Sequence, residues 1–246
     1  MVVGKVAFVT GAGSGIGREV CRALARQGAR VIGADRNLKS AEETIASLNG
    51  REHLALHVDV SNELSVDDAL KSAVDKYSTP PTVIVNSAGI TRDQFILKLA
   101  SKDFDEVLHV NLKGTFNVIK GAVREMIDAD VSRDGSIVNL SSIIGKVGNM
   151  GQANYAASKA GVTALTRTAS LEFGQFGIRV NAVLPGFIET PMTETVPDNV
   201  KQMFIKKVPL RRMGKPAEVA EVITFLASGK SSYINGASIE VTGGLH

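Results

Sequence analysis

Residues 5–17, with the sequence KVAFVTGAGSGIG, decide the fold that we predict for this chain. An apolar run typical of a buried strand leads into a glycine-rich turn, and residues 15–28 continue with the pattern of an amphipathic helix. Glycines let the backbone turn sharply and let its N–H groups approach an anion, while the start of a helix adds partial positive charge. The glycine spacing differs from the G-x-G-x-x-G fingerprint, so the prediction of a dinucleotide site depends on the order of strand, turn and helix. The turn residues expected to contact the dinucleotide are Gly11, Ser14, Gly15, Ile16 and Gly17.

Short β-branched runs alternate with helical patterns along the whole chain. Several of these runs are almost continuously apolar, as expected of strands whose sheet is covered by helices on both faces. No composition break divides the 246 residues, so we predict a single α/β domain with a doubly wound parallel sheet. The expected strands are 5–10, 29–35, 53–60, 82–89, 135–142, 178–186 and one around 237–243, and the expected helices are 15–28, 62–77, 101–130, 154–175 and 216–228.

One irregular region, residues 186–214, is too long for a tight connection. Long loops in compact domains are often functional lids, so we expect this region to form a lid over the substrate.

Composition excludes several classes of protein. The sequence enters a strand almost at once, without a basic-then-apolar leader or an apolar run of about 18 residues, so we expect neither secretion nor a membrane span. The formal net charge is only +3, and basic residues are not concentrated as in nucleic-acid-binding proteins. Cys21 is the only cysteine, which rules out an intrachain disulfide and weakly favours a reducing compartment.

Acidic residues after the second and third strands predict how the cofactor is held. Asp35 follows Gly17 by 18 residues, close to where a carboxylate accepts hydrogen bonds from the ribose hydroxyls of NAD and would repel the extra phosphate of NADP. Arg36 complicates this reading, because its guanidinium could pair with that phosphate. The glycine turn has Ser14 and no second cation that could bind the phosphate, so we favour NAD over NADP. Asp59, beside Val60, either reaches the adenine amino group or caps the helix expected from residue 62.

Tyr155 and Lys159 lie four residues apart in the alanine-rich stretch NYAASKAG, which predicts one helical face with Cβ atoms ~6 Å apart. A phenol ionises near pH ~10 unaided, and a nearby ammonium group favours the phenolate. We therefore expect Lys159 to lower the pKa of Tyr155 so that the phenol exchanges a proton with a carbonyl or alcohol oxygen. Ser141 or Ser142, at the end of a predicted strand, would hold that oxygen, and the spacing alone does not choose between them.

Together these motifs resemble those of the short-chain dehydrogenase/reductases, over essentially the whole chain. The resemblance rests on TGAGSGIG, NSAG at 86–89, Tyr155 with Lys159, and PG at 185–186. It implies a Ser-Tyr-Lys centre, selects Ser142 because it lies thirteen residues before the tyrosine, and adds Asn111 through a water-linked proton relay. The residues that it further places at the cofactor are Asn86, Ala88, Gly89, Pro185, Gly186, Ile188 and Thr190, besides Tyr155 and Lys159.

A narrower resemblance connects the chain with the 3-oxoacyl-[acyl-carrier-protein] reductases and, within them, the type 8 17β-hydroxysteroid dehydrogenase subfamily. It rests on SSIIGKVGNMGQANYAASKAGV, RVNAVLPGFIETPMT and EVTGGL. The resemblance implies NAD(H), a substrate linked to acyl carrier protein or CoA, and fatty-acid synthesis. It also implies a homotetramer, or a heterotetramer with a second reductase subunit, in the mitochondrial matrix, with the cytoplasm as the alternative. Oxidation of estradiol or testosterone, and a non-catalytic NAD-binding sensor or scaffold, remain alternative functions.

A basic stretch forms the second half of the expected lid. Residues 201–215, KQMFIKKVPLRRMGK, carry six cations and no acidic residue. They either attract an acidic carrier or the phosphates of CoA, or form a solvated helix face. Arg133, before the strand that leads to the serines, is a second candidate contact for such a carrier.

Overall fold

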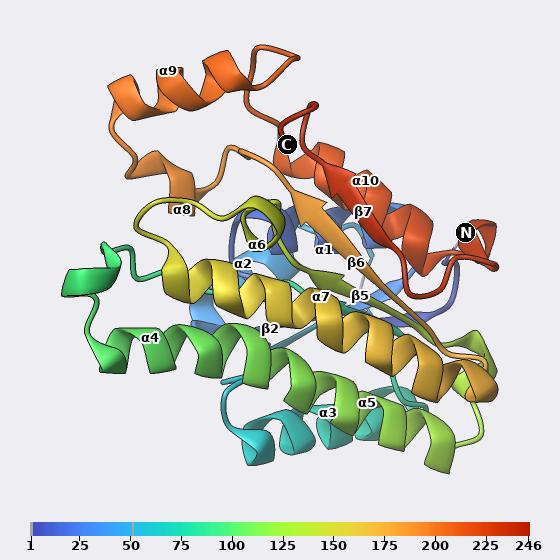
Figure 1. Cartoon of the computed structure of the whole chain (residues 1–246). Coiled ribbons are helices and arrows are strands. Elements are labelled where there is room, and N and C mark those ends of the chain that lie inside the picture. Colours follow the sequence, from blue (N-terminus) through green and yellow to red (C-terminus); the bar gives the residue numbers. More distant parts are fainter. Residues whose placement is uncertain (1, 51) are drawn as a thin grey trace.

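The computed structural model describes residues 2–50 and 52–246. Within them, seven strands form one parallel sheet in the order β3-β2-β1-β4-β5-β6-β7 (Figure 1). The predicted α/β fold with a doubly wound parallel sheet is therefore confirmed. The strands are β1 (Val6–Thr10), β2 (Arg30–Asp35), β3 (Leu54–His57), β4 (Val83–Asn86), β5 (Ser136–Leu140), β6 (Arg179–Pro185) and β7 (Ser238–Val241).

Helices cover both faces of the sheet (Figure 1). Successive residues of a strand point to opposite faces: Val9 of β1 belongs to the same buried cluster as Leu24 of α1, whereas Phe8 shares the other buried cluster with Leu70 of α3. The α-helices are α1 (Gly15–Arg26), α2 (Leu38–Ala46), α3 (Glu63–Tyr77), α4 (Ser101–Leu108), α5 (Gly114–Asp128), α6 (Ile144–Val147), α7 (Ala153–Phe173), α8 (Pro191–Glu194), α9 (Asp198–Lys207) and α10 (Pro216–Ala227).

One expected strand is shorter in the structure, and one helix is present that was not expected. The third strand ends at His57, so Asp59 and Val60 lie in the loop after β3 rather than within a strand. Helix α2 was not expected. Its N-cap, Asn37, accepts a hydrogen bond from the backbone N–H of Ser40. Asparagine is a preferred N-cap residue, so this position could have indicated the start of the helix.

The single helix expected over residues 101–130 is interrupted. A π-helical segment, His109–Lys113, joins α4 to α5 and contains the buried Asn111. Such single wide turns are frequent at functional sites, and periodicity does not reveal them because the flanking helices keep their own pattern.

The region 186–214 is more ordered than its sequence indicates, because it contains α8 and α9. These two helices project beyond the end of the sheet, at the upper left of Figure 1. The base of the region is closed by backbone hydrogen bonds from Glu189 N to Gly214 O (2.9 Å) and from Gly214 N to Phe187 O (2.9 Å). Of the helices in the described ranges, none is both long and apolar enough to cross a bilayer.

Candidate active site

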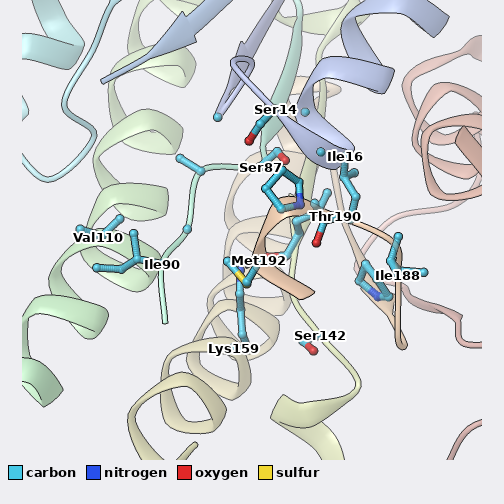
Figure 2. A pocket seen from close by; sticks show the side chains of 18 of the residues that line it. Ser14, Ile16, Ser87, Ile90, Val110, Ser142, Lys159, Ile188, Thr190 and Met192 are labelled. Carbon is cyan, nitrogen blue, oxygen red and sulfur yellow. Dashed lines mark hydrogen bonds between the residues drawn. The ribbon is translucent and has the colours of Figure 1, made fainter. Parts of the chain in front are cut away.

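A cleft of ≈ 360 Å³ opens at the carboxyl ends of the strands, a volume within the range of small-molecule sites, ~300–1,000 Å³. It lies where the strand order changes direction, between β1 and β4, the usual ligand position in an open α/β sheet. Figure 2 shows Ser14 and Ile16 at the top of the cleft and Ser142 and Lys159 at the bottom. All the predicted site residues except Asn86 and Asn111 line it.

Gly11 and Gly17 in the glycine turn have no space for a side chain. A Cβ atom on Gly17 would overlap the carbonyl oxygen of Gly11, and one on Gly11 would lie 2.8 Å from the backbone nitrogen of Ala88. Ser14 is the N-cap of α1, but its side chain does not cap the helix. The first N–H groups of α1 are therefore left to bind an anion such as a pyrophosphate.

Asp35 is held rigidly at the end of β2. One carboxylate oxygen accepts a hydrogen bond from Gly13 N and the other from Asn37 N, each at 2.9 Å. Each carboxylate oxygen has further acceptor capacity, and Asp35 lines the cleft together with Arg36. This arrangement fits the hydroxyls of a ribose.

Asp59 does not cap α3. That role belongs to Asn62, whose side chain accepts hydrogen bonds from Leu64 N and Ser65 N. Asp59 instead accepts hydrogen bonds from the hydroxyl (2.6 Å) and backbone N–H (3.0 Å) of Ser61, and these lower the pKa of its carboxyl group. Asp59 remains on the cleft wall, so the capping alternative is excluded and the contact with adenine stays a prediction.

The two serines after β5 have different environments. The hydroxyl of Ser141 donates to the carbonyl oxygen of Lys159 (2.8 Å) and pairs with the hydroxyl of Thr163 (2.9 Å), which ties β5 to α7. The hydroxyl of Ser142 accepts a hydrogen bond from Ile144 N (3.2 Å) and stays available at the cleft. Geometry thus favours Ser142 as the group that holds a substrate oxygen.

Tyr155 and Lys159 lie on the same turn of α7, with Nζ of Lys159 5.6 Å from the centroid of the tyrosine ring. Nζ donates to the carbonyl oxygen of Leu140 at 2.7 Å. Burial lowers the pKa of the Lys159 ammonium group to about 8.

The expected lowering of the pKa of Tyr155 is wrong for this structure. Burial raises the pKa of Tyr155 to about 12; the Ser142 hydroxyl opposes the shift, and the Asp93 carboxylate adds to it. Removing the phenolate from water costs more free energy than the hydrogen bond from Ser142 recovers. The side chain of Tyr155 is therefore neutral at pH 7.

Asn86 and Asn111 support the cleft from behind. Asn86 donates to the side chain of Asn139 (2.8 Å). The side chain of Asn111 bonds both backbone groups of Ile90 (2.8 and 3.0 Å) and donates to Ser158 (3.0 Å). Asn86 does not line the cleft itself, so its contact with the cofactor and the relay role of Asn111 both stay predictions.

The sequence interpretation missed several residues on the cleft wall. Half of them lie at or after the carboxyl ends of strands, and the rule that ligands bind there could have found them; the others belong to α8 or to the π-helical segment His109–Lys113. The missed residues are Val58, Ser87, Ile90, Val110, Leu140, Pro191, Met192 and Thr193.

The basic stretch is partly neutralised by residues outside it. Arg212 forms a two-pronged ion pair with Glu218, at 2.8 and 2.6 Å, and Nζ of Lys201 lies 3.6 Å from Asp198. Arg133 lies before the start of β5. The five residues of β5 span about 17 Å, so Arg133 lies at the end of the sheet opposite the cleft.

A family model and several relatives agree in the family to which they connect this chain. A family model described as enoyl-(acyl carrier protein) reductase matches residues 11–246. The chain is 49% identical to (3R)-3-hydroxyacyl-CoA dehydrogenase of Canis lupus familiaris and 48% identical to the Homo sapiens protein of that name, covering 98% of this chain and 96% and 95% of those proteins. It is 46% identical to 3-oxoacyl-[acyl-carrier-protein] reductase FabG of Thermotoga maritima, covering 98% of each chain.

Proposed function

Because the chain belongs to the short-chain dehydrogenase/reductase family of oxidoreductases, which bind a nicotinamide cofactor, we propose that it interconverts 3-oxoacyl and 3-hydroxyacyl thioesters with NAD(H). The single observation that carries this proposal is the joint placement of Ser142, Tyr155 and Lys159 in the cleft that also contains the glycine turn. The names of the relatives, 3-hydroxyacyl-CoA dehydrogenase and 3-oxoacyl reductase, supply the thioester class.

Each residue has a defined task in reduction. Ser142 donates a hydrogen bond to the substrate carbonyl oxygen, and Tyr155 transfers its phenolic proton to that oxygen as the C=O bond becomes an alcohol. The buried ammonium group of Lys159 then stabilises the phenolate that remains. A nicotinamide bound in this cleft would supply the hydride for the carbonyl carbon. The glycine turn would hold the pyrophosphate and Asp35 the ribose.

The charge state of the free site suits this direction. Since burial keeps Tyr155 protonated, the phenol already carries the proton that reduction requires. A serine hydroxyl and a phenol at one cleft fit a carbonyl oxygen, which accepts both hydrogen bonds.

The test is steady-state reduction of acetoacetyl-CoA with NADH, compared with oxidation of estradiol by NAD. We expect turnover of the thioester and its loss in Tyr155→Phe, with the dissociation constant of NADH nearly unchanged in that variant. Near-normal turnover in Tyr155→Phe would refute the acid role, and faster oxidation of estradiol would assign the site to steroids.

We propose NAD rather than NADP because Asp35 lines the cleft near the glycine turn, where its carboxylate would repel the extra phosphate of NADP. Replacing Asp35 with Ser should raise kcat/KM for NADPH relative to NADH by at least about tenfold, since one unfavourable charge contact is removed. An unchanged ratio would transfer the discrimination to another residue, Arg36 first.

The assembly and the compartment are further proposals that depend on the family resemblance. It supports a tetramer, alone or with a second reductase subunit, in the mitochondrial matrix. Light scattering of the purified chain distinguishes a monomer from a tetramer, and cell fractionation distinguishes the matrix from the cytoplasm.

A further inference from the structure

Four large apolar side chains are exposed on two neighbouring loops beside α7. Phe95, Ile96 and Leu97 are 63%, 74% and 100% exposed, and Met150 is 85% exposed. We call these four residues the apolar rim. Single exposed apolar residues need no explanation, but such a group marks a surface for an apolar ligand or partner.

The two loops are fastened to each other. Gln94 N donates to Gly151 O (2.8 Å), the side chain of Gln152 donates to the Asp93 carboxylate (3.0 Å), and Asn154 donates to the carbonyl oxygen of Arg92 (2.8 Å). Gln94 pairs with Gln152 in a parallel bridge, so the two segments run side by side in the same direction. The apolar rim therefore spans two loops that are joined to each other.

This surface adjoins the reacting groups. Asn154, one of the fastening residues, directly precedes Tyr155 and accepts a hydrogen bond from its backbone N–H (2.7 Å). Figure 1 shows the short turn of residues 96–98 beside the start of α7, on the side of the molecule toward which α8 projects. A substrate carbonyl held by Tyr155 thus has the apolar rim as its neighbour outside the cleft.

Two charges next to the apolar rim, those of Arg92 and Asp93, have partners of their own. Arg92 forms a two-pronged ion pair with Glu106, at 3.0 and 2.9 Å, and Asp93 also accepts a hydrogen bond from the hydroxyl of Thr91. Paired charges of this kind offer little to an ionic ligand, so the apolar side chains dominate what the surface can bind.

We propose that the apolar rim binds the alkyl chain of a long-chain 3-oxoacyl thioester and makes the enzyme selective for chain length. This inference rests on the proposed function, because it uses the position of the substrate carbonyl at Tyr155. Loops fixed by hydrogen bonds before binding lose little freedom when the chain docks, which favours the complex.

The test compares kcat/KM for acetoacetyl-CoA and 3-oxodecanoyl-CoA. A half-covered chain should raise kcat/KM about twofold per added methylene, on the order of 50-fold across the six methylenes. The double variant Phe95→Ser/Leu97→Ser and the single variant Met150→Ser should each flatten this rise while leaving turnover of acetoacetyl-CoA within about twofold. Leu171→Ser is the matched control, because Leu171 is 82% exposed on the same helix as Tyr155 but about 24 Å along its axis.

Each other outcome overturns the proposal. An unchanged chain-length profile in the rim variants shows that the chain lies elsewhere. If the variants change the mass measured by light scattering and lower the activity toward both thioesters equally, the apolar rim belongs to a contact between copies of this chain. Turnover of neither thioester by the unaltered enzyme refutes the proposed function itself, whereas good turnover of acetoacetyl-CoA with a flat profile refutes only the role of the apolar rim.

Discussion

The adjacent serines after β5 predict opposite effects when each is replaced by alanine. Ser141 is buried and bonded to Lys159 and Thr163. After Ser141→Ala the Lys159 carbonyl oxygen keeps the hydroxyl of Thr163 at 3.2 Å as a donor, so the net loss is one buried hydrogen bond. That costs about 1 kcal/mol of unfolding free energy, which lowers Tm by about 2–4 °C in a chain of this size. Turnover should stay within about threefold, because the cleft keeps its groups.

Ser142→Ala should show the reverse pattern. Besides its contact with the Tyr155 phenol, the Ser142 hydroxyl bonds to Ile144 N, and because it faces the cleft, stability should change by less than about 0.5 kcal/mol. Losing a donor to the developing oxyanion should lower kcat about 10²–10³-fold. Thermal unfolding and NADH oxidation with acetoacetyl-CoA measure both effects. Loss of turnover in Ser141→Ala with an active Ser142→Ala would refute the assignment of the two serines.

Three further predictions follow from the cleft. Lys159→Met should raise the unfolding free energy at pH 7 by on the order of 2 kcal/mol, because burial destabilises the ammonium group; this advantage should fade from about pH 8 to 10.5, where the folded wild type releases its proton before the unfolded chain does, and an advantage independent of pH would contradict the cause. Asp93→Asn removes a negative charge that raises the pKa of Tyr155, so the alkaline limb of the kcat/KM profile should move to lower pH, and a move upward would exclude this electrostatic effect. Gly17→Ala forces a methyl group onto the carbonyl oxygen of Gly11 and should cost about 1–3 kcal/mol in folding or NADH binding, which calorimetry and circular dichroism separate; unchanged affinity and stability would show that the turn can widen.

The sequence predicted the sheet because its evidence is local and repeated. Strands such as Val6–Thr10 are short and apolar on both sides, and the intervening helices have the other period. The same logic placed the glycine turn and the pair Ser141 and Ser142 at strand ends, and Tyr155 one helical turn from Lys159. These positions line one cleft because parallel strands bring their carboxyl ends to one edge.

Other features depend on packing that a linear pattern does not contain. The pKa of Tyr155 was expected to fall because Lys159 is four residues away, but burial, which the spacing does not show, raises it. The basic stretch lacks acidic residues within itself, yet Glu218 folds back onto Arg212 from the next helix. The interchangeable appearance of Ser141 and Ser142 in sequence disappears once α7 supplies hydrogen-bond partners for only one of them.

The wide turn at His109–Lys113 restricts insertions and deletions along the rod formed by α4 and α5. Each residue advances an α-helix by about 100°, so deleting one residue would restore regular winding and swing Asn111 away from Ile90. Everything before it would rotate as well, and Val107, now fully buried, would turn away from the interior. The burial of Val107 and the position of Asn111 thus both fix the number of residues in α4 and α5. Related proteins should therefore accept substitutions in these helices far more readily than an insertion or a deletion.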